Sequence, residues 1–495
     1  MIAQLAIGQF VINKSFDIFG GGDVSYVIWS DTSGFTLELS PACNPQSTVF
    51  GCPGLLKTNT EGDSLWAKTF SSGNIVDFLR DQEGYYYACG QEYADTSTLY
   101  RPFVRKLDKE GDSIWIRYYD GPLKDSAIDI EESLDGHLIV YNLGGVFGEY
   151  SIITVQKLHR EDGSVIWEEE VETGLFFPSA GELTVLQDSS IMLAYHYPAP
   201  DNHRGYAVSK LSPQGETLWT RRFSEGNTQQ YAAFIEALPD GGVAVAWGKD
   251  SLNVPLQFKA INFYLQRLDE NGQTEWEFFR QVRQKKVYGI AVTQNGDIVL
   301  CGLSNSPEIG GITYSWLARF SPEGEMRWER SYLSPGSPQP AWGFQDVTEA
   351  PDGGLAMCGF ITDTVPGQPG AINDNVWLAK VGPDGCLTPG CQDTIIYITS
   401  TREAAGGPAQ VKEVFFRAFP NPASDPLQVQ FYNPVRYRSA RLRVFNMQGQ
   451  QLWQAPLQKG TRELEVPAGQ WPSGLYLLQY EAEGRVLQVE KVVRE

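Results

Sequence analysis

Short apolar runs bounded by turn residues recur along residues 1–391, and they give the first picture of the fold. Seven of these runs directly follow a turn, in the segments SDTSGFTLEL, DQEGYYYACG, SLDGHLIVYN, QDSSIMLAYH, PDGGVAVAWG, QNGDIVLCG and PDGGLAMCG. Asp-Gly, Asn-Gly and Gly-Gly steps between apolar runs supply the positive φ that tight hairpin turns require. No apolar stripe with the 3.6-residue period of a helix accompanies them. The pattern therefore predicts a chain of antiparallel hairpins.

A second phrase interleaves with the first: a basic residue, an apolar residue, a turn containing Gly, and Trp four positions after that Gly. The six complete copies pair Gly62 with Trp66, Gly111 with Trp115, Gly163 with Trp167, Gly215 with Trp219, Gly272 with Trp276 and Gly324 with Trp328. A seventh copy, KVGPDGCL, keeps Gly385 but has no Trp. Repetition at a period of about 50 residues is typical of solenoids and propellers.

Each period holds two hairpins, and therefore four short strands. Seven such repeats predict an all-β fold, a seven-bladed β-propeller of four-stranded blades over residues 1–391. The seventh blade lacks its own fourth strand, and we expect the N-terminal segment near Phe16–Phe19 to complete it and close the ring, which removes an exposed edge. We expect each Trp to pack between adjacent blades, and each repeat Gly to adopt the left-handed conformation of its turn.

The net negative charge of the chain argues against some classes of partner. The chain carries a formal net charge of −21, and residues 1–410 hold 28 basic against 52 acidic side chains. An acidic propeller argues against nucleic acid or an anionic membrane as a partner, and is explained by solubility or by cation binding. No apolar run is long enough for a membrane-spanning helix. The start, Met1 to Phe10, lacks the basic region of a signal peptide, so the sequence as written does not contain one.

The seven cysteines fall into two kinds. Cys43 and Cys52 flank one short loop rich in turn residues, and Cys386 and Cys391 flank another, so we expect two local disulfides and an oxidising compartment. The other cysteines lie in apolar strand-like runs and are interpreted as small buried hydrophobic residues: Cys89, Cys301 and Cys358.

The repeat, with its GCLTPGC tail, resembles the propellers of secreted Bacteroidetes proteins over about residues 16–391. Those motifs specify fold and lineage and carry no chemistry. The Gly–Trp spacing is also similar to the docking repeats of quinoprotein dehydrogenases, but the chain has no adjacent Cys-Cys pair. Sialidase boxes place the aromatic residue three positions after Gly, and here it comes at four.

Catalytic and metal-binding motifs are absent from the sequence. It contains no G-x-S-x-G, P-loop, C-x-x-C or H-x-x-x-H pattern, so we assign no catalytic residue, no cofactor and no metal ligand, and leave a structural cation open. His196, His203 and Asp201 share one polar segment, which is interpreted as a surface loop rather than a zinc site because no fourth ligand can be named.

Ligand binding is expected on one face of the ring, where the loops between blades converge with the loops between second and third strands. Such loops on a rigid scaffold are the usual location of binding residues. The candidate aromatic residues there are Phe176, Phe177 and Trp342. They suit a glycan or a protein partner.

The chain changes character after the last repeat. Residues 392–413 contain Ala-Gly-Gly-Pro and predict a linker, and residues 414–495 predict a small Ig-like β-sandwich. This last segment closely resembles the type A C-terminal sorting domain of the type IX secretion system of Bacteroidetes. The matching residues are Pro420, Asn421, Pro422, Ala423, Leu442, Val444, Asn446, Gly449, Ser473, Gly474, Leu475, Tyr476, Lys491, Val492 and Val493.

The resemblance implies a partner and a destination: the type IX secretion machinery, and the cell surface or the medium. It also implies a signal peptide, which we expect to have been trimmed from the sequence as written. The function predicted for the whole is a non-enzymatic binding or adhesion protein for glycan or protein. The alternative is an extracellular carbohydrate-active hydrolase or lyase with its site in the propeller's central funnel. An acid–base pair with perturbed pKa values facing the funnel would favour the enzyme.

Overall fold

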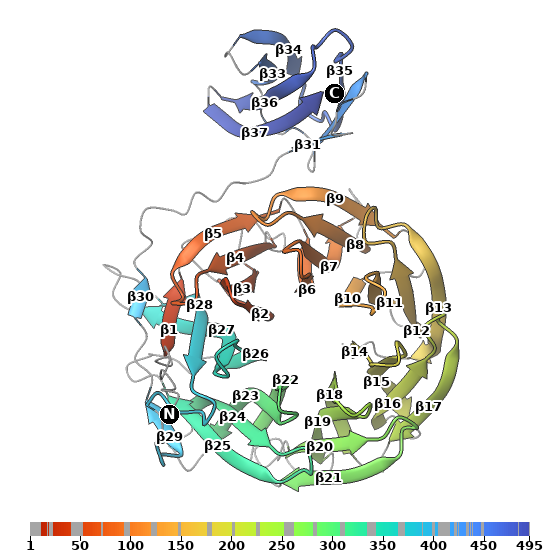
Figure 1. The fold of residues 1–495 in the computed structure, drawn as a ribbon, viewed down its shortest axis with the longest axis vertical. Coiled ribbons are helices and arrows are strands. Elements are labelled where there is room, and N and C mark those ends of the chain that lie inside the picture. The colour runs from red at the N-terminus through yellow and green to blue at the C-terminus, as the bar shows by residue number, and fades with distance from the viewer. Residues whose placement is uncertain are drawn as a thin grey trace, which may run out of the picture.

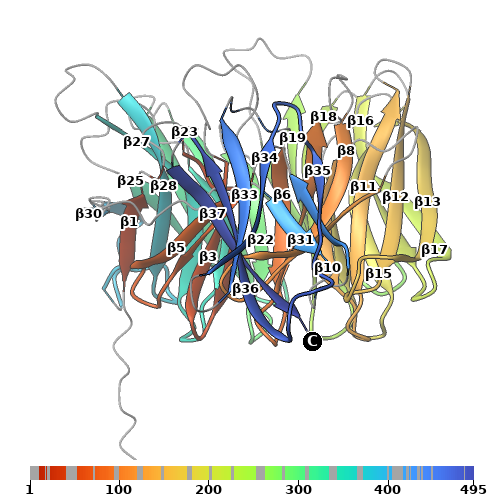
Figure 2. The same ribbon diagram turned by 90° about the horizontal axis from the view of Figure 1, so that it is seen from above.

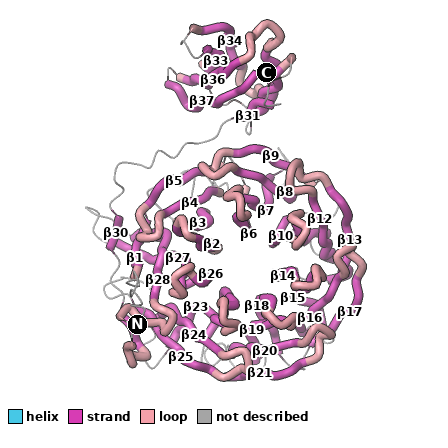
Figure 3. The backbone as a smooth tube through the Cα atoms, in the orientation of Figure 1, coloured by secondary structure: helices cyan, strands magenta, loops and turns pink. Residues whose placement is uncertain are grey.

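The computed structural model describes two sets of residues. In the first part of the chain these are residues 11–16, 18, 23–40, 53–70, 73–93, 100–119, 126–146, 150–175, 181–199, 203–223, 228–251, 262–280, 285–306, 312–333, 343–364, 372–388, 390–397 and 401–403. In the C-terminal part they are residues 416–419, 423, 425–431, 435, 437, 439–446, 450–483 and 485–494. Every regular element among them is a β-strand, and none is a helix (Figure 3).

Antiparallel four-stranded sheets stand side by side around a ring in a propeller-like arrangement (Figure 1). The first three, in chain order, are β2 (Ile28–Asp31), β3 (Gly34–Leu39), β4 (Gly54–Thr58) and β5 (Ser64–Thr69); β6 (Asn74–Arg80), β7 (Tyr86–Tyr93), β8 (Tyr100–Leu107) and β9 (Ser113–Tyr118); and β10 (Ser126–Glu132), β11 (Leu138–Val146), β12 (Tyr150–Leu158) and β13 (Val165–Leu175).

The next sheets are β14 (Glu182–Val185), β15 (Ile191–Ala199), β16 (His203–Leu211) and β17 (Thr217–Phe223); and β18 (Thr228–Ala237), β19 (Val243–Ser251), β20 (Asn262–Leu268) and β21 (Thr274–Arg280). One parallel bridge between Arg204 and Gln229 joins these two. Then come β22 (Lys285–Val292), β23 (Ile298–Ser306), β24 (Ile312–Phe320) and β25 (Met326–Leu333), followed by β26 (Phe344–Glu349), β27 (Leu355–Thr364) and β28 (Ile372–Val381). Figure 2 shows the ring from the side, with these strands running between its two faces.

The N-terminal strand β1 (Ile12–Phe16) completes the last of these sheets. It pairs antiparallel with β28 from Ile12 opposite Lys380 to Phe16 opposite Val376. The strand thus begins and ends earlier than the Phe16–Phe19 segment expected from the sequence. Its pairing joins the two ends of the ring through hydrogen bonds (Figure 1).

Trp and Gly of successive repeats pack against each other, which confirms the predicted role of both. A Cβ built on Gly111, Gly163, Gly215, Gly272, Gly324 or Gly385 would lie within 3 Å of the ring of the Trp one sheet earlier in the chain. All six glycines have positive φ, between 70° and 93°. Each Trp stands opposite the basic residue of the third strand, as Trp66 stands opposite Lys57. At the ring closure Ile12 occupies this register position, opposite Lys380 and against Gly62.

Gly215 and Gly241 have nearly the same backbone conformation but different surroundings. Comparing their alanine variants separates the cost of a left-handed backbone from the cost of a clash with the Trp ring. Gly215 has φ of 93° and its Cβ would lie 2.7 Å from Trp167 Cε3, whereas Gly241 has φ of 95° and no atom within 4 Å of that position. We expect Gly241→Ala to cost about 1–2 kcal/mol of unfolding free energy, for the left-handed backbone alone. Gly215→Ala should cost about 1–3 kcal/mol more, because the methyl group overpacks the indole. Urea unfolding of both variants measures the difference, and equal losses would refute the Trp–Gly contact as a stabilising feature.

Two short strands lie within the 392–413 segment that the sequence assigns to a linker. β29 (Ile395–Tyr397) pairs parallel with β25, and β30 (Thr401–Glu403) pairs parallel with β1. Each adds a fifth strand to the outer edge of one sheet. The ring therefore uses the chain as far as Glu403.

The C-terminal part forms two further sheets. One contains β31 (Phe416–Phe419), β32 (Leu427–Phe431) and β35 (Glu463–Val466), and the other contains β33 (Ala440–Asn446), β34 (Gln451–Leu457), β36 (Gly474–Ala482) and β37 (Arg485–Arg494). Alternate side chains of both sheets enter one hydrophobic core, which includes Val429, Leu442, Val444 and Leu478. This part has its own core, as a separate domain requires.

Candidate functional site

The first strand of every sheet in the ring contributes to one central cavity. The strands β2, β6, β10, β14, β18, β22 and β26 lie nearest the centre in Figure 1. Residues of all of them line a cavity of about 890 Å³. A cavity of this size can hold an oligosaccharide or another small ligand.

The lining of this cavity is acidic. Its charged side chains are Asp77, Asp129, Glu131, Glu182, Glu236, Asp346 and Glu349, and no Lys, Arg or His is among the lining residues that the structure describes. Low-dielectric walls lined by charge of one sign focus the electrostatic potential inside a cleft. The cavity therefore offers an anion no described basic partner, and each of its acids that ionises adds negative charge.

Four of these carboxyl groups connect neighbouring sheets. Each accepts a hydrogen bond from a backbone N–H of the next first strand around the ring. The pairs are Ile130 N–H to Asp77 (3.0 Å), Leu183 N–H to Asp129 (2.6 Å), Ile235 N–H to Glu182 (3.2 Å) and Ile28 N–H to Asp346 (3.0 Å). Such bonds satisfy inner-strand amides that the sheets themselves leave unpaired. These four acids accordingly have a structural role whatever else they do.

The positions of these acids follow a rule that the repeats reveal. Asp77, Asp129, Glu182 and Asp346 each come four residues before the first residue of the following hairpin turn. Phe234 and Gly289 hold this position in the other two repeats with the same turn. An alignment of the repeats by their turns could have found the four acids, which the sequence prediction missed.

Asp77 and Asp129 form a carboxyl–carboxylate pair. The two side chains share a hydrogen bond, and burial together with the negative charge of Asp129 raises the pKa of Asp77 well above its usual value. Burial also raises the pKa of Asp129. Two carboxyl groups this close cannot both be ionised at low cost, so one of them keeps a proton.

Glu131 and Glu236 are the acids of the lining for which the described contacts include no hydrogen bond to a neighbouring sheet. Burial, followed by the charges of Asp129 and Glu236, raises the pKa of Glu131 well above its usual value. Burial, followed by the charges of Asp346 and Asp129, raises the pKa of Glu236 to about 8. A carboxyl group that holds its proton near neutral pH can act as a general acid.

Aromatic side chains share the cavity with these acids. Tyr26, just before β2, is 47% exposed, and Trp29, within β2, is 36% exposed. Both line the cavity together with Phe234 and Tyr288. The rings of Tyr26 and Trp29 are therefore accessible to a ligand that enters the cavity. Sugars and organic cations both bind well to aromatic faces.

The structure places some of the predicted residues elsewhere and leaves others undescribed. Phe176, Phe177 and Trp342, as well as Cys43 and Cys52, lie outside the described residues. The Cys386–Cys391 disulfide is present. Cys89, Cys301 and Cys358 are free and buried as predicted, and burial raises the pKa of each thiol.

The two histidines of the segment 196–203 lie on paired strands. No group of three or more His, Cys, Asp or Glu side chains within it is arranged to hold a metal ion. The interpretation as a surface loop is wrong for His196, which lies buried in β15, while His203 begins β16, opposite Ala199, and Asp201 lies outside the described residues. Within the same described ranges, no helix is long and apolar enough to cross a membrane.

The C-terminal domain brings together the beginning and the end of its predicted motif. The Ala423 N–H donates to the Val493 carbonyl at 2.7 Å, and the Arg494 guanidinium donates to the Ala423 carbonyl at 3.2 Å. Leu475 and Tyr476 in β36 stand opposite Val493 and Val492 in β37. Gly474 begins β36, Asn446 ends β33 opposite Tyr476, and Lys491 lies in β37. Pro420, Asn421, Pro422 and Gly449 lie outside the described residues.

Comparison with known proteins identifies the C-terminal domain. Residues 417–495 match the family model of the secretion system C-terminal sorting domain. A sorting domain of the type IX system indicates export to the cell surface or the medium. No curated protein matches the chain.

Three solved structures resemble the ring, and of these the first reaches a TM-score of 0.50 and supports its fold. An ulvan lyase of a new polysaccharide lyase family superposes with a TM-score of 0.50 at 11% identity, covering 75% of this chain and 96% of the lyase. An α-L-arabinofuranosidase from Fusarium graminearum gives 0.42 at 12% identity, covering 63% and 93% of the two chains. A protein of unknown function from Bacteroides caccae gives 0.39 at 14% identity, covering 62% and 93%. At these identities the likeness concerns the fold alone.

Proposed function

We propose that this chain is an exported propeller that binds a glycan or protein ligand in its acidic central cavity and carries out no chemistry on it. The sorting domain supports export through the type IX machinery. The single observation that carries the binding function is the cavity itself, about 890 Å³ in volume and lined by exposed aromatic side chains and carboxyl groups.

The finer architecture of the proposal is a seven-bladed ring followed by an Ig-like sandwich. The register of β1 supports seven blades, because Ile12 takes the Trp position that the seventh repeat lacks. The shared core of the two C-terminal sheets supports a sandwich. A rigid ring with one axial cavity is well suited to presenting a binding site at a cell surface.

The acidic lining, without a basic side chain among its described residues, disfavours an anionic ligand and favours a neutral or cationic one. An acidic polysaccharide would bring its carboxylates or sulfates against Asp129, Glu131 and Glu236 without a basic partner among the described lining residues. Charge burial without a partner is costly. A lyase acting on uronates needs positive charge to stabilise the developing carbanion, and the lining residues that the structure describes include no Lys, Arg or His. The same argument disfavours the lyase alternative.

A hydrolase acting on a neutral glycan is the second candidate. The observation in its favour is the raised pKa of Glu131 and Glu236, because glycosidases use one carboxylic acid as proton donor and a second carboxylate as base or nucleophile. Perturbed pKa values also arise in purely structural acid clusters, and four acids of this cavity have such a structural role. Binding without turnover is therefore our first proposal.

Binding measurements with charged and neutral sugars test both candidates on the full chain. We expect oligomers of glucose or glucosamine to bind and oligogalacturonate not to bind in titration calorimetry. Trp29→Ala should weaken binding about tenfold, because it removes an aromatic face from the cavity. Leu218→Ala is the matched control, since Leu218 is exposed on the outer strand β17, and it should leave the affinity unchanged.

Product analysis in the same experiment separates binding from catalysis. We expect no shortened sugars after prolonged incubation. Turnover that falls at least about 100-fold in Glu131→Gln or Glu236→Gln would instead establish the hydrolase. Preferred binding of oligogalacturonate would overturn the electrostatic argument.

A further inference from the structure

The segment that follows the last sheet runs along the outside of the ring and crosses its closure. β29 adds to β25 through the pairs Ser331–Ile395, Tyr332–Ile396 and Leu333–Tyr397. β30 then adds to β1 through the pairs Lys14–Thr401, Ser15–Arg402 and Phe16–Glu403. These two strands, with the loop that precedes them, are called the strap (residues 384–397 and 401–403). It connects the outer edges of two neighbouring sheets (Figure 1).

The N-terminal strand is held between the last sheet and the strap. β1 is paired on one side with β28 and on the other with β30. The first strand of the chain therefore cannot leave the ring by its outer edge unless β30 leaves first. The ring closure therefore depends on two successive pairings, β28 with β1 and β1 with β30.

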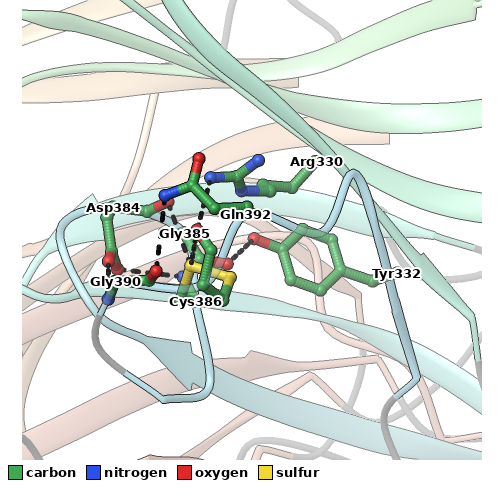
Figure 4. The surroundings of a disulfide bond; sticks show 8 residues. Arg330, Tyr332, Asp384, Gly385, Cys386, Gly390 and Gln392 are labelled. Atoms are coloured by element: carbon green, nitrogen blue, oxygen red, sulfur yellow. Dashed lines mark hydrogen bonds between the residues drawn. A yellow bond between two sulfur atoms is a disulfide. The ribbon is translucent and has the colours of Figure 1, made fainter.

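A disulfide lies at the root of the strap (Figure 4). Cys386 and Cys391 are bonded, and the Asp384 carboxylate accepts the N–H of Cys386 at 3.1 Å and of Gly390 at 2.7 Å. Tyr332 of β25 donates its hydroxyl to the Gly385 carbonyl at 2.7 Å, and Arg330 donates to the Cys391 carbonyl at 3.4 Å. The loop thus attaches directly to the same strand, β25, on which β29 is built.

One side chain anchors the strap in the core. Ile396 is 6% exposed and belongs to the same buried cluster as Tyr332, Phe344 and Trp377. The Cys391 side chain packs against this cluster from the loop. The strap therefore depends on a disulfide, one buried isoleucine and short stretches of parallel pairing, which alone are weak.

We infer that the strap is a redox-dependent latch on the ring closure. The Cys386–Cys391 disulfide keeps the loop compact and so keeps β29 paired with β25. Because β30 follows β29 closely in the chain, it then stays paired with β1. Reduction breaks the S–S bond and forms two thiols, while a dithiol reductant supplies two electrons and two protons and becomes a disulfide itself. The loop then gains conformational freedom, the strap detaches, and β1 keeps only one neighbour.

Hydrogen exchange of the full chain tests this latch. In the double variant Cys386→Ser with Cys391→Ser, we expect peptides covering residues 12–16 and 395–403 to exchange at least tenfold faster. A peptide from β11, Leu138–Val146, should keep its protection. The matched control is Cys43→Ser with Cys52→Ser, which should leave residues 12–16 unchanged. Unchanged exchange of residues 12–16 in the first variant would overturn the inference.

A second perturbation keeps the disulfide and removes the anchor. Where Ile396→Ala accelerates exchange in residues 395–397, exchange in residues 12–16 should rise with it, and protected residues 12–16 beside an exchanging strap would overturn the inference. If the first serine variant does not fold, the Cys43→Ser/Cys52→Ser protein treated with dithiothreitol replaces it. Faster exchange in residues 12–16 after reduction then supports the latch, and no change refutes it.

Discussion

Replacing Ile12 and Phe16 together by alanine is expected to lower the free energy of unfolding by about 5 kcal/mol or more. Both side chains are 3% exposed and belong to the core cluster that joins the last sheet to the first. The two changes create cavities where the first strand of the ring, β1, pairs with β28 through hydrogen bonds instead of a covalent connection. Unfolding can begin there, because at this gap one sheet is built from the two ends of the ring.

The contacts of β1 explain why this effect should be large. Ile12 lies against Gly62, in the position where every other described seam has a Trp. The Trp377 indole N–H donates to the Asn13 side-chain oxygen at 2.7 Å, which connects β1 to the interior of β28. A weakened β1 also weakens β30, since the strap pairs with it.

Urea unfolding monitored by tryptophan fluorescence measures the loss, with Leu65→Ala as the control. Leu65 lies on β5 and is 56% exposed, so its truncation should change stability by no more than about 0.5 kcal/mol. A loss below about 2 kcal/mol in the Ile12/Phe16 variant would mean that the ring does not depend on β1 for closure.

Much of the ring could be predicted because its long-range contacts repeat. Each Trp–Gly pair links neighbouring sheets at a fixed spacing, so local phrases such as KLDKEGDSIW carry information about packing between sheets. The closing strand was expected a few residues too late. Ile12 substitutes for Trp there, and a lone isoleucine gives no comparable signal in the sequence.

The strap and the inner acids lay beyond the prediction for different reasons. β29 and β30 are three residues each, too short for an alternating pattern to be distinguished from loop. The acids could be mistaken for ordinary outward-facing polar residues of alternating strands, as Asp77 within NIVDFLR shows. That their side chains reach the backbone of the next sheet depends on the ring geometry, which appears only after the sheets are assembled.

The stability of the ring is expected to fall as pH rises from 5 to 8, opposite to the acid denaturation of most proteins. Burial raises the pKa of Asp346 to about 7, and of Glu38 and Glu236 to about 8. In the unfolded chain these groups titrate near pH 4. Between these values the folded protein binds more protons than the unfolded one, so this stabilisation is complete below about pH 4 and is lost as pH rises to 8.

Groups with lowered pKa values act in a separate pH range. The Lys157 ammonium and the Ser133 hydroxyl, opposed by desolvation, hold the pKa of Asp135 at about 2. Asp135 thus stabilises the fold above about pH 4, and this contribution is lost as pH falls toward 2. The net negative charge of the ring adds repulsion as pH rises, in the same direction as the buried acids.

Thermal unfolding at pH 5, 6, 7 and 8 measures the effect, and we expect the midpoint to fall by about 5 °C or more across this range. Glu236→Gln should flatten the curve, because an amide imitates the protonated acid and cannot ionise. Asp135→Asn is the contrasting variant: it should lower the midpoint by the same amount at every pH from 5 to 8, where the wild-type carboxylate is ionised, and so leave the slope of the curve unchanged. A midpoint that rises steadily from pH 5 to 8 in the wild-type chain would show that the inner acids are ionised without cost. The cavity would then carry its full negative charge at neutral pH, and the preference for cationic ligands would be stronger than the protonated acids permit.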